Sequence, residues 1–143
     1  MTVYQISLFM ENKEGRVQKA ISTLGKSDIN IRALSLADTA KYGILRLIVS
    51  DNKKAIEALE NAGFVVKESE VIIVKINDEP NGLNSVLQIL DTEKINVEYL
   101  YAFVTSKIDE ALVVMRLEDM EKGNNVLKEN NAELLSLEEI KKL

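Results

Sequence analysis

The sequence predicts an α+β protein made of two tandem ferredoxin-like βαββαβ units, each with an antiparallel sheet and helices on one face. The main observation is an internal repeat, because the stretch 10–31 recurs 66 residues later as 76–97. In both copies the apolar spacing changes from two to three and four after a polar loop, which marks a strand leading into a helix. The order of elements in each copy is the split βαβ pattern. We therefore expect two domains, 1–69 and 70–143.

The two copies match position by position without a gap across a loop, a helix and the start of a strand. A gapless match that extends over a loop, a helix and a strand start is not expected by chance, and it indicates a duplicated unit. At the fixed offset the pairs are Val17 with Leu83, Ala20 with Val86, Ile21 with Leu87, Leu24 with Leu90, and 29–31 with 95–97.

The first copy contains the local signals that end and begin helices. Gly25, just past the last apolar helix position, is expected to be a left-handed stop. Asp51 is placed to cap a second helix, which Gly63 ends. In order, the expected elements are a strand at 3–10, a helix at about 15–24, strands at 29–37 and 43–49 joined by a turn at 38–41, a helix carrying 55–62, and a strand at 64–67.

The second copy repeats this order with a longer turn at 105–110, after which the offset rises to about 68. Ser136 and Glu139 form a capping-box pattern for a short final helix. The junction 64–71 contains neither glycine nor proline, so we expect the units to sit rigidly side by side. The other expected elements are strands at 71–76, 95–104, 111–117 and 133–136 and helices at 82–90 and about 119–129.

Composition narrows the functional classes. The 143 residues are 46% apolar and 29% charged, which suits one ordinary domain or two small ones. No apolar run approaches the roughly 18 residues of a membrane span, and the first residues lack the features of a signal peptide, so we expect a soluble, cytoplasmic protein. The absence of cysteine and histidine removes thiolate chemistry, the commonest metal ligand and the usual general base. We expect no metal and no cofactor.

The charge distribution argues against nucleic acid as a partner. The net charge is -5; residues 1–70 carry 10 basic and 9 acidic side chains, whereas residues 71–143 carry 8 and 14. Phosphate binding depends on clustered Lys and Arg, and only 53–54 and 141–142 cluster at all. These pairs are typical of solvated helix surface.

Catalysis has little support. The acidic pairs 78–79 and 118–119 lie in a loop and at a helix start, where acids are ordinary. No P-loop, Rossmann glycine pattern or nucleophile elbow is present. We therefore expect that the protein is not an enzyme.

The chain has a duplicated unit of about 70 residues. It also has strand-end loops at 14–17 (EGRV) and 80–83 (PNGL), and second strands that start with Ile-Asn-Ile and Ile-Asn-Val. In these three features the chain resembles the ACT family. It resembles in particular the small stand-alone proteins of two ACT domains. The resemblance implies an amino-acid-sensing regulatory module. It also implies a ligand bound where the loop between the first strand and first helix of one domain meets the second strand of a neighbouring domain.

A helix N-terminus suits the carboxylate of an amino acid, since its free N–H groups and the helix dipole favour an anion. The amides of Gly15, Arg16 and Val17 are assigned to that carboxylate, and Asn12 and Asn30 to the polar groups of the ligand. Asn30 is equally explained by hydrogen bonds to local backbone. From the second copy, Glu98 is expected to accept a hydrogen bond from the ligand's ammonium group, and Tyr99 or Tyr101 to pack against the ligand's side chain. The two tyrosines are equally explained as ordinary residues of a half-exposed strand. The full set of predicted ligand-binding residues is Met10, Asn12, Gly15, Arg16, Val17, Asn30, Glu98, Tyr99 and Tyr101.

The second copy departs from the family pattern, because Asn81 stands where Gly15 stands in the first and the glycine follows at Gly82. Asn tolerates the left-handed conformation, but its side chain is placed to fill the pocket. We therefore expect a second, weaker site. Its residues are Asp78, Asn81, Gly82, Leu83 and Asn96.

Two functional hypotheses remain. In the first, the chain senses a free amino acid; in the second, the fold retains only interaction surfaces and no ligand. Expected partners are a free amino acid, a second copy of the chain, and a regulated enzyme or other protein; no membrane is expected. The homodimer follows if Leu34, Leu36, Leu45, Leu47 and Val49 face the helices, because the opposite face then carries the apolar Ile31, Ala33, Ile44 and Ile48.

Overall fold

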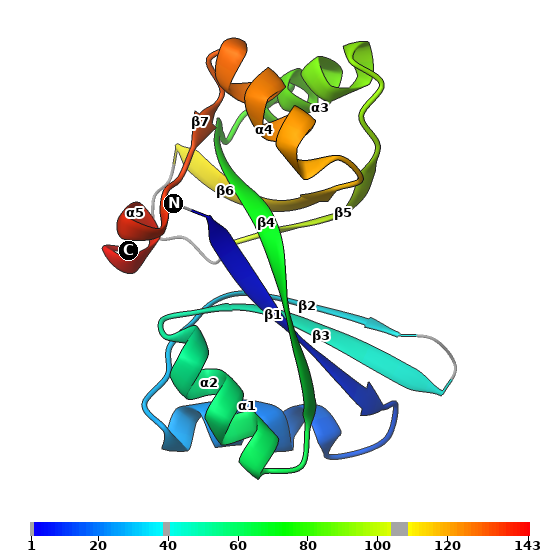
Figure 1. The fold of residues 1–143 in the computed structure, drawn as a ribbon, viewed down its shortest axis with the longest axis vertical. Helices are drawn as coiled ribbons and strands as arrows, with labels where there is room; N and C mark the ends of the chain where they lie inside the picture. Colours follow the sequence, from blue (N-terminus) through cyan, green and yellow to red (C-terminus); the bar gives the residue numbers. More distant parts are fainter. Residues whose placement is uncertain (1, 39–40, 104–108) are drawn as a thin grey trace. The chain divides into compact units, whose positions relative to one another are not determined.

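The computed structural model describes residues 2–38, 41–103 and 109–143. These form two compact units: Tyr4–Ser69, the first unit, and Glu70–Leu143 together with residues 2–3, the second unit. Figure 1 shows each unit as a sheet with two helices on one of its faces. The predicted fold class, tandem ferredoxin-like units with antiparallel strands, is confirmed. No helix in the described part of the chain is long and apolar enough to cross a membrane.

In the first unit, β3 pairs antiparallel with both β1 and β2, and the strand order is β2-β3-β1-β4. The elements are β1 (Val3–Glu11), α1 (Arg16–Lys26), β2 (Ile31–Asp38), β3 (Tyr42–Val49), α2 (Asn52–Asn61) and the beginning of β4 (Val65–Asn77). Apolar residues at alternate strand positions pack against the apolar stripes of both helices. The buried core comprises Ile6, Leu8, Met10, Ala20, Leu24, Ile29, Leu45, Leu47, Val49, Ala55, Leu59 and Phe64.

The second unit has the order β5-β6-β4-β7, so β7 occupies the place that β4 has in the first unit. Its remaining elements are α3 (Gly82–Thr92), β5 (Val97–Ala102), β6 (Glu110–Leu117), α4 (Met120–Glu129), β7 (Glu133–Leu134) and α5 (Leu137–Lys141). The buried core comprises Ile72, Val74, Val86, Leu90, Ile95, Val113, Met115, Leu117, Val126 and Leu127.

The helix caps predicted at Asp51 and at Ser136 are present, and Asp119 caps α4 as well. The carboxylate of Asp51 accepts a hydrogen bond from the Lys54 amide at 3.1 Å, and Asp119 accepts one from the Lys122 amide at 3.0 Å. Both halves of the capping box of Ser136 and Glu139 form at the start of α5. Each cap satisfies a backbone donor that the first turn of a helix leaves free.

Two expectations about element boundaries were wrong. The strands expected at 64–67 and 71–76 are parts of one continuous strand, β4. Gly25 does not end α1 but lies inside it, and the left-handed residue is Asp28, with φ of 56°. The chain closes the helix there because the Asp28 amide donates to the carbonyl of Gly25 and the Ile29 amide to that of Leu24. The predicted turns at 38–41 and 105–110 include residues outside the described ranges.

The predicted faces of the first sheet also require correction. A β-bulge between Ile31 and Ala33 puts Ile31 against the helix-side core, whereas Ala33 pairs with Ile48 on the other face. Leu34 and Leu36 lie opposite the core residues Leu47 and Leu45, yet they remain 44% and 53% exposed. They stay exposed because β2 is at the edge of the sheet.

Replacing Gly25 with alanine is expected to stabilise the first unit by roughly 0.5–1 kcal/mol. The position is helical, and a Cβ there would have no heavy atom within 4 Å. Alanine then loses less conformational entropy on folding than glycine. Urea unfolding followed by circular dichroism measures the change, and a loss of stability would contradict the assignment of Gly25 to the helix interior.

Candidate functional site

The predicted loop lies between the end of β1 and the start of α1. Gly15 is the residue before the first turn of α1 and has φ of 85°, a left-handed conformation that glycine adopts without steric cost. A Cβ added there would have no heavy atom within 4 Å. Glycine is therefore required by the backbone angle, and the space beside it is open.

The backbone amides at the start of α1 are the groups that an anion would contact. The first helical hydrogen bond runs from the Lys19 amide to the Gly15 carbonyl at 3.0 Å, so the amides of Gly15 and Val17 precede the hydrogen-bonded part of the helix. The Arg16 amide donates to the Lys13 carbonyl at 3.4 Å, a long bond that uses one predicted donor within the loop. The first turn of α1 carries no acidic residue, so the positive end of its dipole is not compensated there.

Two cations lie over one buried aromatic ring beside this helix start. The Arg16 guanidinium carbon is 4.9 Å from the centre of the Phe64 ring, and the Lys19 Nζ is 5.6 Å from it. Arg16 and Lys19 share a face of α1 because they are three residues apart. The Nε of Arg16 is buried and has no hydrogen-bond partner among the described residues. The face is electropositive, and one of its donors lacks an acceptor.

An apolar surface adjoins the loop. Met10, 4% exposed, is the last core residue of β1 and lies opposite Gly43 of β3. Leu36 Cδ1 and Met10 Cγ flank the Cβ position of Gly43 at 3.5 and 3.8 Å. The Asn12 amide donates to the Lys41 carbonyl at 2.9 Å, which ties the loop to the start of β3. Met10 and Leu36 therefore lie beside the loop that carries Asn12.

The second copy of the loop has the same backbone hydrogen bonds but different side chains. Asn81 has φ of 70°, so the left-handed conformation survives the change from glycine. The Asp78 amide donates to the Asp109 carbonyl, and the Gly82 amide to the Glu79 carbonyl, as the Asn12 and Arg16 amides do in the first copy. The Oδ1 of Asn81 accepts a hydrogen bond from Asn84 Nδ2 at 3.5 Å.

The charge of the first loop is missing from the second. At the positions of Arg16, Lys19 and Phe64 the second copy has Gly82, Ser85 and Ala132. Gly82 is required by packing, because an added Cβ would overlap the Asn77 carbonyl. Leu83 packs against the core of the second unit. The two loops share these hydrogen bonds and a left-handed residue, but among the described residues only the first loop combines them with cations over an aromatic ring.

Neither Asn30 nor Asn96 joins the loop of its own unit. The Asn30 carbonyl accepts from the Ser50 amide and its amide donates to Ser50 Oγ, both at 3.0 Å, so Asn30 lies at the far end of α1 from Gly15. The Asn96 carbonyl accepts from the Glu118 amide in the same way. The backbone, rather than the amide side chain, makes these bonds.

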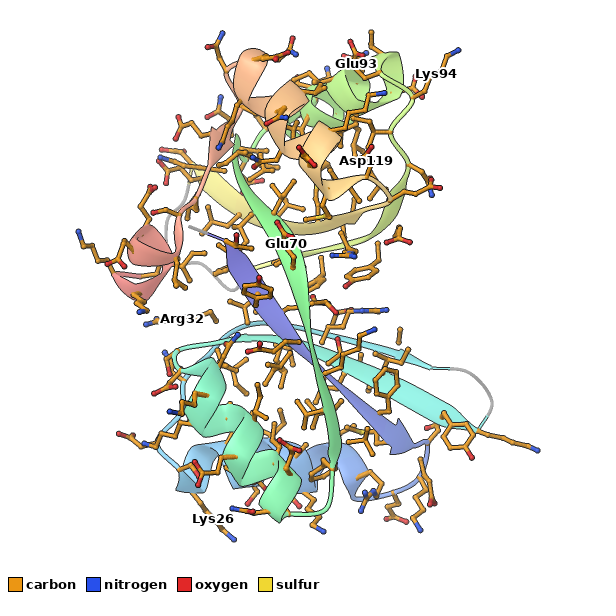
Figure 2. All side chains as sticks on the ribbon, viewed as in Figure 1. Lys26, Arg32, Glu70, Glu93, Lys94 and Asp119 are labelled. Carbon is orange, nitrogen blue, oxygen red and sulfur yellow. The ribbon has the colours of Figure 1, made fainter. Side chains whose placement is uncertain are left out.

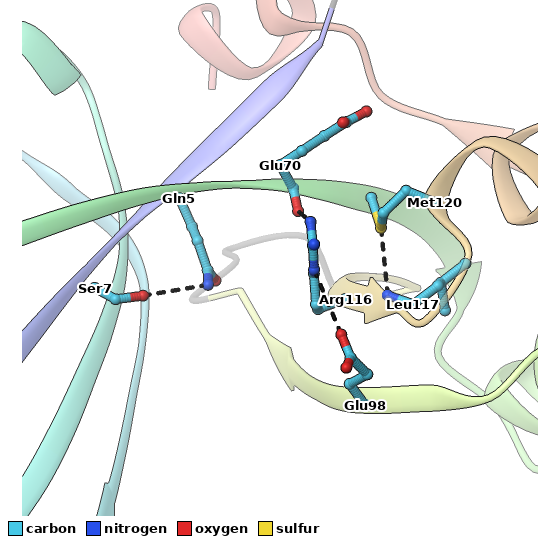
Figure 3. Close-up of polar contacts among 7 residues, drawn as sticks. All are labelled: Gln5, Ser7, Glu70, Glu98, Arg116, Leu117 and Met120. Atoms are coloured by element: carbon cyan, nitrogen blue, oxygen red, sulfur yellow. Dashed lines mark hydrogen bonds and ion pairs between the residues drawn. The ribbon is translucent and has the colours of Figure 1, made fainter.

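The residues predicted on β5 have other contacts. The Arg116 Nε lies 3.5 Å from the Glu98 carboxylate, and Arg116 Nη1 donates to the Glu70 carbonyl at 2.7 Å (Figure 3). The rings of Tyr99 and Tyr101 stack with centres 6.5 Å apart. Both tyrosines are on the sheet face away from the helices, since their partners Arg116 and Val114 alternate with core residues. Glu98 is therefore already paired with a cation.

An open cavity of about 620 Å³ lies elsewhere in the second unit, and Asn96 lines it. Figure 2 labels three of its charged residues, Lys94, Glu70 and Asp119. Several of its polar groups bond locally: Lys122 Nζ donates to the Glu93 carbonyl at 3.0 Å, and the Asp119 carboxylate caps α4. The predicted acidic pair that contains Asp119 thus has a structural explanation.

Lys75 forms a second electrostatic cluster. Its Nζ is 3.1 Å from the Glu110 carboxylate and 3.3 Å from that of Glu133. Hydrogen bonds to Glu110 and then to Glu133 raise the pKa of Lys75 above its ordinary value. The three residues come from β4, β6 and β7, so this partly buried cluster connects three strands of one sheet.

Sequence reasoning missed Lys19, Leu36, Gly43 and Phe64. The spacing of Arg16 and Lys19 on a helix is a signal that identifies Lys19. No local pattern relates Phe64 to Arg16, because the two meet only after α2 and β4 have packed.

The ACT domain pair model matches residues 1–143, the whole chain. The crystal structure of protein BT0572 from Bacteroides thetaiotaomicron has 39% sequence identity and a TM-score of 0.92, covering 100% of this chain and 98% of that one. The ligand-free regulatory subunit of aspartate kinase from Thermus thermophilus has 16% identity and a TM-score of 0.65, covering 88% and 91%, and therefore shows a shared fold alone. A comparison with curated protein sequences found no significant match. Because the family model and the relative at 39% identity both cover this chain from end to end, the protein belongs to the family of ACT domain pairs.

Proposed function

We propose that the protein is a non-catalytic regulatory protein that binds a free amino acid at the start of α1 in the first unit. The observation that supports this best is the combination of an open, left-handed Gly15 with the half-buried Arg16, whose Nε has no acceptor among the described residues. A carboxylate placed there receives backbone N–H groups, the positive end of a helix dipole and a guanidinium.

The other parts of the ligand have neighbours in the same unit. Asn12 is the proposed partner for polar groups, and Leu36, 53% exposed, is the proposed apolar surface for a side chain, since Met10 beside it is buried in the core. Glu98 is left out of this site because its carboxylate pairs with Arg116. In the second copy, Asn81 fills space that Gly15 leaves open, which supports a weaker site or none.

A regulatory role agrees with the family. ACT domains are regulatory modules, and the aspartate kinase subunit that shares this fold is named as a regulatory subunit. We propose that occupancy of the site changes how the chain contacts a separate target, an enzyme or another protein. The alternative is an interaction module of the same fold that binds no ligand. Such a module has no need for a cationic loop in which a donor lacks an acceptor.

Thermal unfolding of the purified chain with each common amino acid tests the proposal. A ligand that binds only the folded state stabilises it by about 2.7 kcal/mol at a hundredfold excess over Kd. We expect one amino acid, or one chemical group of them, to raise Tm in a concentration-dependent way. If no amino acid changes Tm or gives heat in calorimetry, the interaction-module alternative is favoured.

We also propose that the chain forms a homodimer, for a different reason from the one first expected. Ala33 and Ile48, 0% and 2% exposed, are already buried within one chain, and Ile31 belongs to the helix-side core. The exposed apolar residues are instead Leu34 and Leu36 on the edge strand β2. An exposed apolar edge strand is a surface that another strand readily covers.

A further inference from the structure

Arg16 and Lys19 place two positive charges beside one aromatic ring. The Arg16 guanidinium carbon lies 4.9 Å from the centre of the Phe64 ring and the Lys19 Nζ lies 5.6 Å from it. Both are inside the range of about 6 Å in which a ring attracts a cation. Like charges on neighbouring positions of a helix repel each other. The ring offsets part of this repulsion, and a bound anion would offset more of it.

The first unit supplies little negative charge to this pair of cations. Helix α1 contains no Asp or Glu among its residues Arg16–Lys26. Within the described part of the chain, neither Arg16 nor Lys19 has a carboxylate within ion-pair distance. Glu11, at the end of β1, is paired with Lys13 at 3.2 Å. Two positive charges at the start of α1 are therefore available to a ligand.

These two charges lie close to the backbone amides at the start of the helix. A helical side chain leans toward the N-terminus, so Lys19 covers the preceding turn, in which Arg16 lies. The contact of both cations with Phe64 agrees with this direction. A single carboxylate bound at the amides would neutralise only one of the two charges. A second anionic group on the same ligand would neutralise the other.

We propose that the amino acid bound in the first unit has a second carboxylate in its side chain, and that Lys19 selects this class of ligand. In this arrangement Arg16 and the amides of Gly15 and Val17 hold the α-carboxylate. The Lys19 ammonium donates to the side-chain carboxylate, a charge-assisted hydrogen bond. The inference rests on the proposed function and adds to it the class of ligand, an acidic amino acid.

Leu36 is the competing surface for the ligand's side chain, and it favours an apolar amino acid instead. It lies on β2, whereas Phe64 directly precedes β4, and the strand order β2-β3-β1-β4 puts these strands on opposite sides of β1. We favour the cationic side for two reasons. A single exposed leucine is ordinary on a protein surface. A buried donor such as the Arg16 Nε, in contrast, seldom lacks an acceptor.

The second loop lacks the residues that would select an acidic ligand. At the positions of Lys19 and Phe64 it has Ser85 and Ala132. Ser85 Oγ donates to the Asn81 carbonyl at 2.8 Å, so this hydroxyl is used within the start of α3. The loop also carries the acidic pair 78–79, which repels a second carboxylate. We therefore expect one acidic amino acid to bind per chain.

Calorimetry with amino acids of matched size tests the class of ligand. L-Aspartate and L-asparagine differ by one charge at nearly the same volume, as do L-glutamate and L-glutamine. We expect one of the acids to bind at least about tenfold more tightly than its amide, because only the acid supplies a second negative charge. Equal or tighter binding of the amides, or tightest binding by an apolar amino acid, would overturn this inference and leave the proposed function intact. If none of the common amino acids binds, the proposed function itself fails.

Lys19→Met tests the residue that we assign to selection. Methionine keeps an unbranched, helix-forming side chain and removes the charge. We expect the acid to bind about tenfold more weakly or worse, because the charge-assisted hydrogen bond is lost, while the affinity for its amide stays the same. The variant should unfold like the original chain, as circular dichroism would show.

Lys26→Met is the matched control. Lys26 is the last residue of α1, two turns beyond Lys19 on the same helix face, and Figure 2 labels it. This variant removes the same charge and should bind the acid like the original chain. Equal losses for acid and amide in Lys19→Met would mean that Lys19 supports the loop without selecting its ligand. Equal losses of acid binding in the two variants would indicate an effect of net charge alone. Either result would overturn the role assigned to Lys19.

Discussion

Replacing Gly15 with valine is expected to abolish amino-acid binding, with a loss of affinity of at least about a hundredfold, or about 2.7 kcal/mol. Gly15 has φ of 85°, a region that β-branched residues strongly disfavour, and the space beside it is open. Valine would therefore both distort the backbone that presents the amides and occupy the proposed position of the carboxylate. Calorimetry with the amino acid identified by thermal unfolding measures the loss.

Two further variants separate distortion of the backbone from filling of the space. Gly15→Asn copies the second loop, where Asn81 keeps φ at 70°, so its backbone should be retained while a side chain enters the site. We expect it to weaken binding but to unfold like the original chain. Asn81→Gly, which removes a side chain from the other loop, should leave the main affinity unchanged. Equal losses in Gly15→Val and Asn81→Gly, or a loss at Asn81 alone, would place the site in the second loop.

Replacing Gly82 with alanine is expected to destabilise the second unit by about 1–3 kcal/mol or more, as overpacking does elsewhere. The added Cβ would overlap the Asn77 carbonyl. That carbonyl cannot easily move, because it accepts the Glu79 amide at 2.9 Å and Asn77 is held opposite Glu110 at the end of β4. The loop or the start of α3 must shift instead.

Urea unfolding measures the loss, and hydrogen exchange read by mass spectrometry locates it. Protection should fall in α3 and β4 of the second unit. Gly25→Ala is the matched control, since it is the same substitution at a helical position with open space and should change stability in the opposite direction. If Gly82→Ala unfolds at the same urea concentration as the original chain, the close approach to Asn77 is not a constraint on this loop.

The contrast between the two loops explains why a duplicated protein can have unequal sites. Both loops use the same hydrogen bonds and both hold a left-handed residue before the helix. The difference lies in the side chains at the positions of Arg16 and Phe64, which the second copy replaces with Gly82 and Ala132. Duplication therefore preserved the backbone hydrogen bonds and the left-handed residue, while the side-chain charges of the two loops diverged.

The sequence by itself determined the duplication, the order of elements and the helix starts. These features depend on local patterns: the period of apolar residues, a capping side chain such as Asp51 or Ser136, and a residue that tolerates positive φ such as Gly15 or Asn81. Each of these patterns involves residues that are close together in the sequence. They can therefore be recognised without knowing which other elements pack against them. The end of α1 shows the limit, since the local pattern predicted a stop at Gly25, whereas the hydrogen bonds place the left-handed residue at Asp28.

Only the tertiary structure decided which side chains meet between elements. The contact of Arg16 with Phe64 and the pairing of Glu98 with Arg116 join segments that no periodicity relates. The bulge at Arg32 moved Ile31 into the core, and the edge position of β2 left Leu34 and Leu36 exposed although they share a face with buried leucines. Periodicity reports which face a residue is on. Exposure and contact depend also on strand order and register, and these are set when the whole sheet and its helices pack together.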